Sequence, residues 1–162
     1  MSYSQFTMES LKKEFNLIFQ ERQKIFEHIT PINPSSHLQE TLQENIPLAL
    51  AIHTEKARTE LIIAPILVEI SKLFAHKISI FSGTHFNVDS SKVLTGNCDF
   101  MISYSSIITL IEAKNDNIKS GIHPCIAEMV AAQIFYQQKN NLIAVPPIVR
   151  DLRNLVSDGT IA

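Results

Sequence analysis

The sequence predicts an α/β fold in which helices flank a mixed β-sheet, in the order α-β-β-β-α-β, behind an N-terminal helical extension. Three observations predict it. The first half of the chain has apolar residues at helical spacing, the middle has a short apolar hairpin, and a helical stretch rich in small residues then precedes an apolar run. A hairpin followed by a crossover helix and a further strand is typical of a mixed sheet covered by helices on both faces.

Composition limits the classes of protein to consider. With 162 residues, of which 45% are hydrophobic and 19% charged, the chain fits one globular domain with a sizeable core. The net charge of -2 means that any nucleic-acid partner must be bound by a local patch. Two cysteines without C-x-x-C spacing favour a cytoplasmic protein without disulfides or structural zinc. Residues 1–6 do not resemble a signal peptide, and the longest apolar run, 61–68, is too short for a membrane span, so no membrane contact is expected.

Helices are expected in the first half of the chain. Apolar residues at spacings of three and four predict an amphipathic helix over 7–29, ended by Pro31. Ser36 and Gln39 form a capping box for a short helix over 37–44. Asn45 and Pro47 then predict the start of a long helical stretch over 48–75, interrupted or kinked around Pro65.

The second half predicts the sheet. β-branched and aromatic residues predict a strand over 77–81, and 82–95 reads as a polar connection. After the central hairpin we expect a helix over 119–139, a strand over 142–145 and a short closing helix over 148–156. The chain is divided into an extension (1–46), a core (47–150) and a tail (151–162) of one domain spanning 1–162.

The central hairpin brings two acidic residues together. Strands over 98–104 and 108–114, joined by a tight turn at Ser105 and Ser106, place Asp99 directly opposite Glu112. Their Cβ atoms would then be about 4.5–5.5 Å apart. Lys114 lies on the same face as Glu112, two residues further along.

These residue types suit a divalent metal site. Two carboxylates can share Mg²⁺ or Mn²⁺, hard cations that prefer oxygen ligands, and the backbone carbonyl of Ala113 offers a third oxygen. Such a metal would polarise a phosphate, and Lys114 would neutralise charge in the transition state. The alternative is a solvated charged edge of the sheet. The continuous apolar run over 108–111 favours a cleft, because a strand of that kind is buried on both faces.

At these residues the chain resembles a known family. The pattern G-N-C-D-F-M-I-S followed by L-I-E-A-K-N is similar to the PD-(D/E)XK nuclease superfamily, above all to uncharacterised bacterial members. The segments 54–69, 81–89 and 121–132 resemble the family's first core helix, first core strand and following helix, in the same order. The resemblance covers roughly two thirds of the chain and implies a restriction-endonuclease-like core.

The resemblance implies roles for individual residues. Asp99 and Glu112 become the metal ligands and Lys114 the catalytic lysine of a Mg²⁺-dependent phosphodiesterase that cleaves nucleic acid, with DNA as the expected substrate. A glutamate of the first core helix often adds a ligand through water; Glu60 is the first choice and Glu55 the second. Independently of the resemblance, a homodimer is kept as an option.

Some positions depart from the family pattern. Asn97 and Cys98 precede Asp99 where a proline is usual, and His123-Pro124 stands where many members carry a glutamine, for which Gln133 is a candidate substitute. The segment 145–156 does not match either. The alternative function is therefore a catalytically inactive nuclease-like fold that binds protein or nucleic acid. The remaining histidines lack the spacing of a zinc site and are read as structural.

Overall fold

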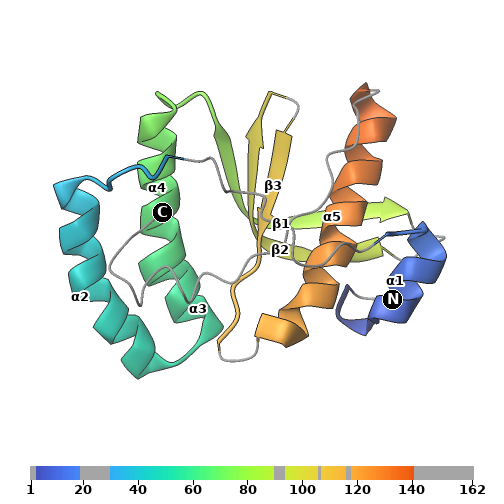
Figure 1. Ribbon diagram of the computed structural model, residues 1–162, viewed down its shortest axis with the longest axis horizontal. Helices are drawn as coiled ribbons and strands as arrows, with labels where there is room; N and C mark the ends of the chain where they lie inside the picture. Colours follow the sequence, from blue (N-terminus) through green and yellow to red (C-terminus); the bar gives the residue numbers. More distant parts are fainter. Residues whose placement is uncertain (1–2, 19–29, 90–93, 106, 116–117, 141–162) are drawn as a thin grey trace.

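The computed structural model describes residues 3–18, 30–89, 94–105, 107–115 and 118–140 (Figure 1). The elements, in chain order, are the 3₁₀ turn η1 (Tyr3–Gln5), α1 (Met8–Phe15), α2 (Ser36–Ile52), α3 (Glu55–Arg58), the π-helical turn η2 (Thr59–Ile63), α4 (Ala64–Leu73), β1 (Ser79–Asp89), β2 (Leu94–Tyr104), β3 (Ile107–Ile111) and α5 (Ile118–Asn140). The predicted α/β class is confirmed.

The three strands form one antiparallel sheet in the order β1-β2-β3. Helices α4 and α2 lie on one side of the sheet, while α5 and the N-terminal α1 lie on the other (Figure 1). The described sheet is therefore antiparallel rather than mixed. The strand expected over 142–145, which would make it mixed, and the closing helix over 148–156 fall outside the described residues.

The hairpin register is as predicted. Tyr104 pairs with Ile107 and Phe100 with Ile111, so the connection is two residues long. Ser105 has φ +53°, a left-handed conformation that suits such a tight connection. The second strand was predicted to reach position 114, but β3 ends at Ile111. The acidic and basic residues that follow therefore lie just beyond the ladder.

The first two strands are longer than expected. The polar stretch after position 81 continues β1 to Asp89, because a backbone ladder does not require apolar side chains. Gly83 has φ +62° and lies between the pairs Ser82↔Phe100 and Thr84↔Cys98, at the level of Asp99. Glycine adopts this conformation without a steric penalty, and β1 and β2 change direction along their length in Figure 1.

The helix predicted over 7–29 is not continuous, because α1 ends at Phe15 and residues 16–18 are not helical. Asn16 adopts the left-handed conformation, with φ 51°, and closes the helix. Thr7 caps the start together with Ser10 in a capping box. Apolar spacing could not show this stop, because asparagine interrupts a helix through its backbone and not through hydrophobicity. Residues 19–29 lie outside the described part.

The break predicted at 45–47 is also wrong, because α2 continues through Pro47. Ser35, not Ser36, caps the helix by accepting from the amide of Leu38 at 3.2 Å. The missing amide of Pro47 would have paired with the carbonyl of Gln43, which lies on the exposed side where water can replace it. The helix thus also crosses the boundary between positions 46 and 47, where the sequence placed the start of the core.

The interruption instead comes at His53, which has φ 57° and ends α2. Thr54 then caps α3 by accepting from Ala57, and the π-turn η2 leads into α4. Pro65 lacks the amide that would bond the carbonyl of Leu61 in an α-helix. Asn45 of α2 donates to that carbonyl at 2.9 Å, which joins the two helices at this turn.

The main core lies between α5 and the sheet. Ala127 and Ala131 are completely buried and let α5 approach Cys98 and Met101, so the predicted core position of Cys98 is confirmed. The N-terminal Tyr3, Phe6 and Leu11 complete this cluster. Every helix in the described ranges is too short or too polar to cross a membrane.

Candidate active site at the end of the hairpin

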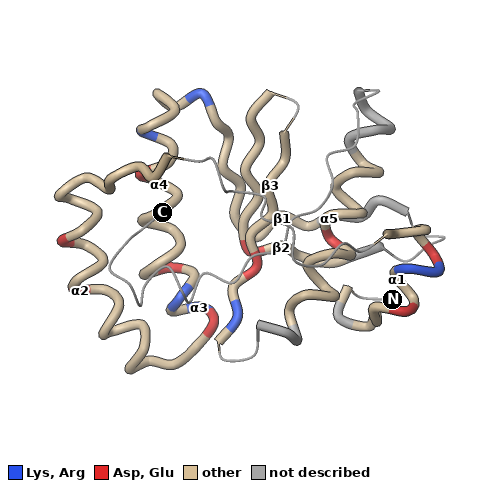
Figure 2. Tube along the Cα trace, viewed as in Figure 1, with Lys and Arg blue, Asp and Glu red and all other residues tan. Residues whose placement is uncertain are grey.

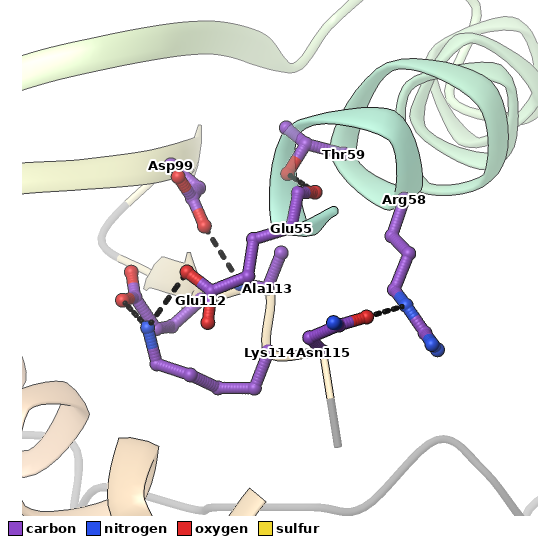
Figure 3. A network of polar contacts seen from close by, with 8 residues as sticks. All are labelled: Glu55, Arg58, Thr59, Asp99, Glu112, Ala113, Lys114 and Asn115. Carbon is purple, nitrogen blue, oxygen red and sulfur yellow. Dashed lines mark hydrogen bonds and ion pairs between the residues drawn. The ribbon is translucent and has the colours of Figure 1, made fainter. Parts of the chain in front are cut away.

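Charged positions in the described chain gather where α3 lies beside the middle of β2 and the end of β3 (Figure 2). The side chains at this point come from three segments that are distant in sequence: α3, the middle of β2 and the residues after β3 (Figure 3). The helix α5 covers the same place from the core side. A methyl group added at Gly121 of α5 would lie 2.7–3.2 Å from the aliphatic carbons of Lys114.

Asp99 is held at the point where the ladder ends. Its Oδ2 accepts a hydrogen bond from the backbone amide of Ala113 at 2.7 Å (Figure 3). If β3 had continued, a backbone carbonyl would have accepted from the amide of Ala113. The carboxylate of Asp99 takes the place of that carbonyl. This bond fixes Asp99 beside the backbone between Glu112 and Lys114, so the predicted meeting of the two strand ends is present.

Lys114 lies between two carboxylates. Its Nζ is 2.7 Å from Oε1 of Glu112 and 3.5 Å from Oε2 of Glu55 (Figure 3). The side chains of Lys114 and Glu112 are only 19% and 15% exposed, whereas that of Glu55 is 52% exposed. The group is therefore partly buried and not the fully solvated edge considered from the sequence.

The pKa values of Glu112 and Lys114 both move upward. Burial raises the pKa of the Glu112 carboxyl, opposed by the hydrogen bond from Lys114 and reinforced by Asp99. Burial alone would lower the pKa of Lys114, but the bond and charge of Glu112, with Glu55 and Asp99, outweigh it and raise that pKa. The neighbouring carboxylates contribute to both upward shifts, but burial is the main cause for Glu112 and opposes the shift of Lys114. The site is rich in negative charge.

Glu60, the helical glutamate preferred from the sequence as a further metal ligand, does not pair with Lys114. Glu60 forms an ion pair with Lys56 at 3.0 Å, and its side chain is 60% exposed. The second choice, Glu55, is the glutamate beside Lys114. Glu55 occupies the first turn of the separate helix α3, which the sequence did not predict. The break at His53 turns Glu55, rather than Glu60, toward the hairpin.

Asn115 ties the chain after Lys114 to the junction of α2 and α3. Its Oδ1 accepts from Nε of Arg58 at 2.9 Å, and its Nδ2 donates to the carbonyl of His53 at 3.0 Å (Figure 3). These bonds connect positions 57 and 62 residues apart in sequence. Asn115 therefore holds Lys114 and Glu55 in one place.

Replacing Asn115 with alanine is expected to lower the free energy of unfolding by about 1–3 kcal/mol, because two hydrogen bonds with groups distant in sequence are lost. Asn115→Asp is the matched variant. It can still accept from Arg58 but cannot donate to the carbonyl of His53, so a smaller loss is expected. Urea denaturation of both variants measures these differences, and an alanine variant as stable as wild type would contradict the clamp.

Glu128 of α5 is the residue that the sequence reading missed. It is 2% exposed, and its Oε2 has no hydrogen-bond partner among the described residues. Burial, followed by the charges of Glu112 and Asp99, raises its pKa to about 8. The available signal was a single acidic residue inside the apolar run C-I-A-E-M-V-A-A. Glutamate is rarely buried without a partner, so that pattern favours a special role.

The donor set at the site consists of oxygen atoms. Asp99, Glu112 and the carbonyl of Ala113 are suitable for Mg²⁺, which usually binds one or two carboxylates and keeps several waters. Within the described part of the chain, no three His, Cys, Asp or Glu side chains are grouped so that they could hold a metal ion. Two carboxylates with a neighbouring buried, unpartnered carboxylate oxygen are compatible with the more hydrated kind of site.

Comparison with protein-family models, with curated proteins and with solved structures found no match for this chain.

Proposed function

We propose that the protein is a Mg²⁺-dependent phosphodiesterase that hydrolyses nucleic acid, with DNA as the expected substrate. The observation that carries the proposal is the junction at the end of the hairpin, where Asp99 bonds the amide of Ala113 at 2.7 Å and Lys114 bonds Glu112 at 2.7 Å. Two acidic residues and one lysine from adjacent strands are the arrangement that metal-assisted phosphoryl chemistry uses. The resemblance of these same residues to the nuclease motif supports the assignment.

Each side chain has a distinct task in this proposal. Asp99, Glu112 and the carbonyl of Ala113 would hold the cation, which supplies Lewis-acid activation of the phosphate and of a water. Lys114 keeps its ammonium form, since its pKa is raised, and stabilises the negative charge that develops on the phosphate oxygens. Asn115 and Arg58 keep the backbone of Lys114 in position.

The alternative is a non-catalytic module of the same shape that binds protein or nucleic acid. One observation favours it: the ammonium of Lys114 already neutralises Glu112 and lies near Glu55, which is an arrangement complete without a metal. Such a module would bind nucleic acid, or a protein, equally well with and without Mg²⁺.

The experiment that decides between them is cleavage of plasmid DNA, single-stranded DNA and RNA with Mg²⁺ or Mn²⁺. Asp99→Asn is the variant to compare, because an amide oxygen can still accept from Ala113 while the carboxylate charge is lost. Wild-type cleavage that requires metal and disappears in Asp99→Asn supports the nuclease. A folded wild-type protein that leaves all three substrates intact with both metals would favour the module.

A further inference from the structure

The side chain of Glu128 is enclosed at the centre of the molecule. It lies in the middle of α5, is 2% exposed, and its Oε2 is without a hydrogen-bond partner in the described ranges. A buried polar oxygen that has left water without gaining a bond costs free energy, typically about 1–3 kcal/mol. Such a group in a folded protein calls for an explanation, of which a catalytic role and a bound water or ion are two.

The helix face that carries Glu128 is turned toward the candidate site. Gly121 packs on the aliphatic part of Lys114, and residues seven positions apart lie on the same face of a helix. Glu128 therefore follows Gly121 two turns later, on the face that contacts the hairpin end. The charges of Glu112 and Asp99 both act on Glu128, which lies within electrostatic reach of the two proposed ligands.

We propose that Glu128 is a third carboxylate of the cation site, supplied by α5, and that it binds a hard divalent cation through one of the cation's waters. The inference rests on the proposed function only in taking Asp99 and Glu112 as ligands. Together with Glu55, these three carboxylates outnumber the single ammonium group of Lys114, and a divalent cation reduces the excess negative charge. Within the described residues, no three His, Cys, Asp or Glu side chains are grouped so that they could hold a metal ion. The link from Glu128 to the cation is therefore made through water.

The test is calorimetric titration of Mn²⁺ and Mg²⁺ into the full chain. Glu128→Gln is expected to weaken Mn²⁺ affinity about 10–100-fold, the usual effect of removing a group that supports a metal site. Glu69→Gln is the matched control. Glu69, on α4, is the other buried carboxylate of the described residues, and its Oε1 accepts from the amide of Ser35 at 2.8 Å. Removing the charge of Glu69 should therefore leave Mn²⁺ affinity unchanged.

A second measurement requires no variant, in case Glu128→Gln fails to fold. The side-chain carboxyl carbon of Glu128, followed by NMR in the wild-type protein, is expected to shift on addition of Mg²⁺. No shift at saturating Mg²⁺ would overturn the proposal.

The outcomes separate this inference from the proposed function. Wild-type Mn²⁺ affinity in Glu128→Gln, with binding abolished in Asp99→Asn, would overturn the role of Glu128 and leave the nuclease proposal standing. Mn²⁺ binding that depends on Glu128, in a protein that cleaves no nucleic acid, would overturn the nuclease and support the cation site. A wild-type protein that binds neither metal would overturn both.

Discussion

Replacing Lys114 with methionine is expected to lower kcat/KM for nucleic-acid cleavage by about 10²–10³-fold, the usual loss when one charge-stabilising group is removed from an active site. Methionine keeps the length and apolar packing of the side chain, which lies against Gly121. What it loses is the ammonium group held 2.7 Å from Glu112. The effect should therefore fall on kcat more than on KM, since that charge acts mainly on the transition state.

Lys56→Met is the matched control for this variant. Lys56 is also a lysine in an ion pair with a glutamate, but its side chain is 82% exposed and its partner is Glu60. An exposed pair contributes little to stability, and we expect cleavage to remain within about twofold of wild type. Equal losses in Lys56→Met and Lys114→Met would indicate a general effect of positive charge on substrate binding and contradict a specific role for Lys114.

The structural and chemical roles of Lys114 can be separated with a second substitution. Lys114→Met leaves the partly buried Glu112 without its cation, so stability falls for reasons unrelated to catalysis. Adding Glu112→Gln removes that orphaned charge and should restore part of the stability while cleavage stays low. Recovery of cleavage together with stability would mean that Lys114 serves only to hold the fold.

The hairpin could be predicted from the sequence because its determinants are local. A turn of two residues and strict alternation leave one register that buries Met101, Ile108 and Leu110 together, and the structure has that register. The pairing of Asp99 with the segment of Glu112 follows directly from it. For the same reason the three motif residues lie together, as the sequence predicted.

The helical glutamate could not be chosen correctly, because its direction depends on backbone events that carry no hydrophobic signal. His53 adopts a left-handed conformation, and the π-turn over 59–63 changes the phase of the helix before Pro65. The single continuous helix predicted over 48–75 contains neither feature. Its periodicity alone therefore does not show whether Glu55 or Glu60 faces the hairpin. The structure turns Glu55 to Lys114 and leaves Glu60 with Lys56.

Glu128 shows a different limit of sequence reasoning. The helix of α5 and its small residues Ala127 and Ala131 were expected, and both alanines are completely buried. Which polar residue shares that buried face depends on how closely α5 approaches the sheet. That approach is set by packing between distant segments, including Gly121 on Lys114, and no local pattern encodes it.

The buried carboxyl of Glu128 should make the stability of the metal-free protein depend on pH. Its pKa is raised from 4.5 to about 8 in the folded chain, first by burial and then by Glu112 and Asp99. The folded state therefore binds this proton more tightly than the unfolded state does. Its contribution to stability is complete below pH about 4.5 and is lost as pH rises through about 8, a change on the order of 3–5 kcal/mol.

Urea denaturation in EDTA between pH 5 and pH 8 measures this change. The wild-type free energy of unfolding is expected to fall across that interval, and Glu112, whose pKa is also raised, acts in the same direction. Glu128→Gln carries no titrating proton at position 128, so its profile of stability against pH should be flatter and its stability relative to wild type should increase toward pH 8.

Glu69→Gln is the control and should retain the wild-type slope, because the amide of Ser35 lowers the pKa of Glu69 and moves its titration to more acidic pH. Parallel profiles for wild type and Glu128→Gln would show that the unpartnered oxygen of Glu128 is already satisfied in the folded protein, which would remove the reason to assign it a cation.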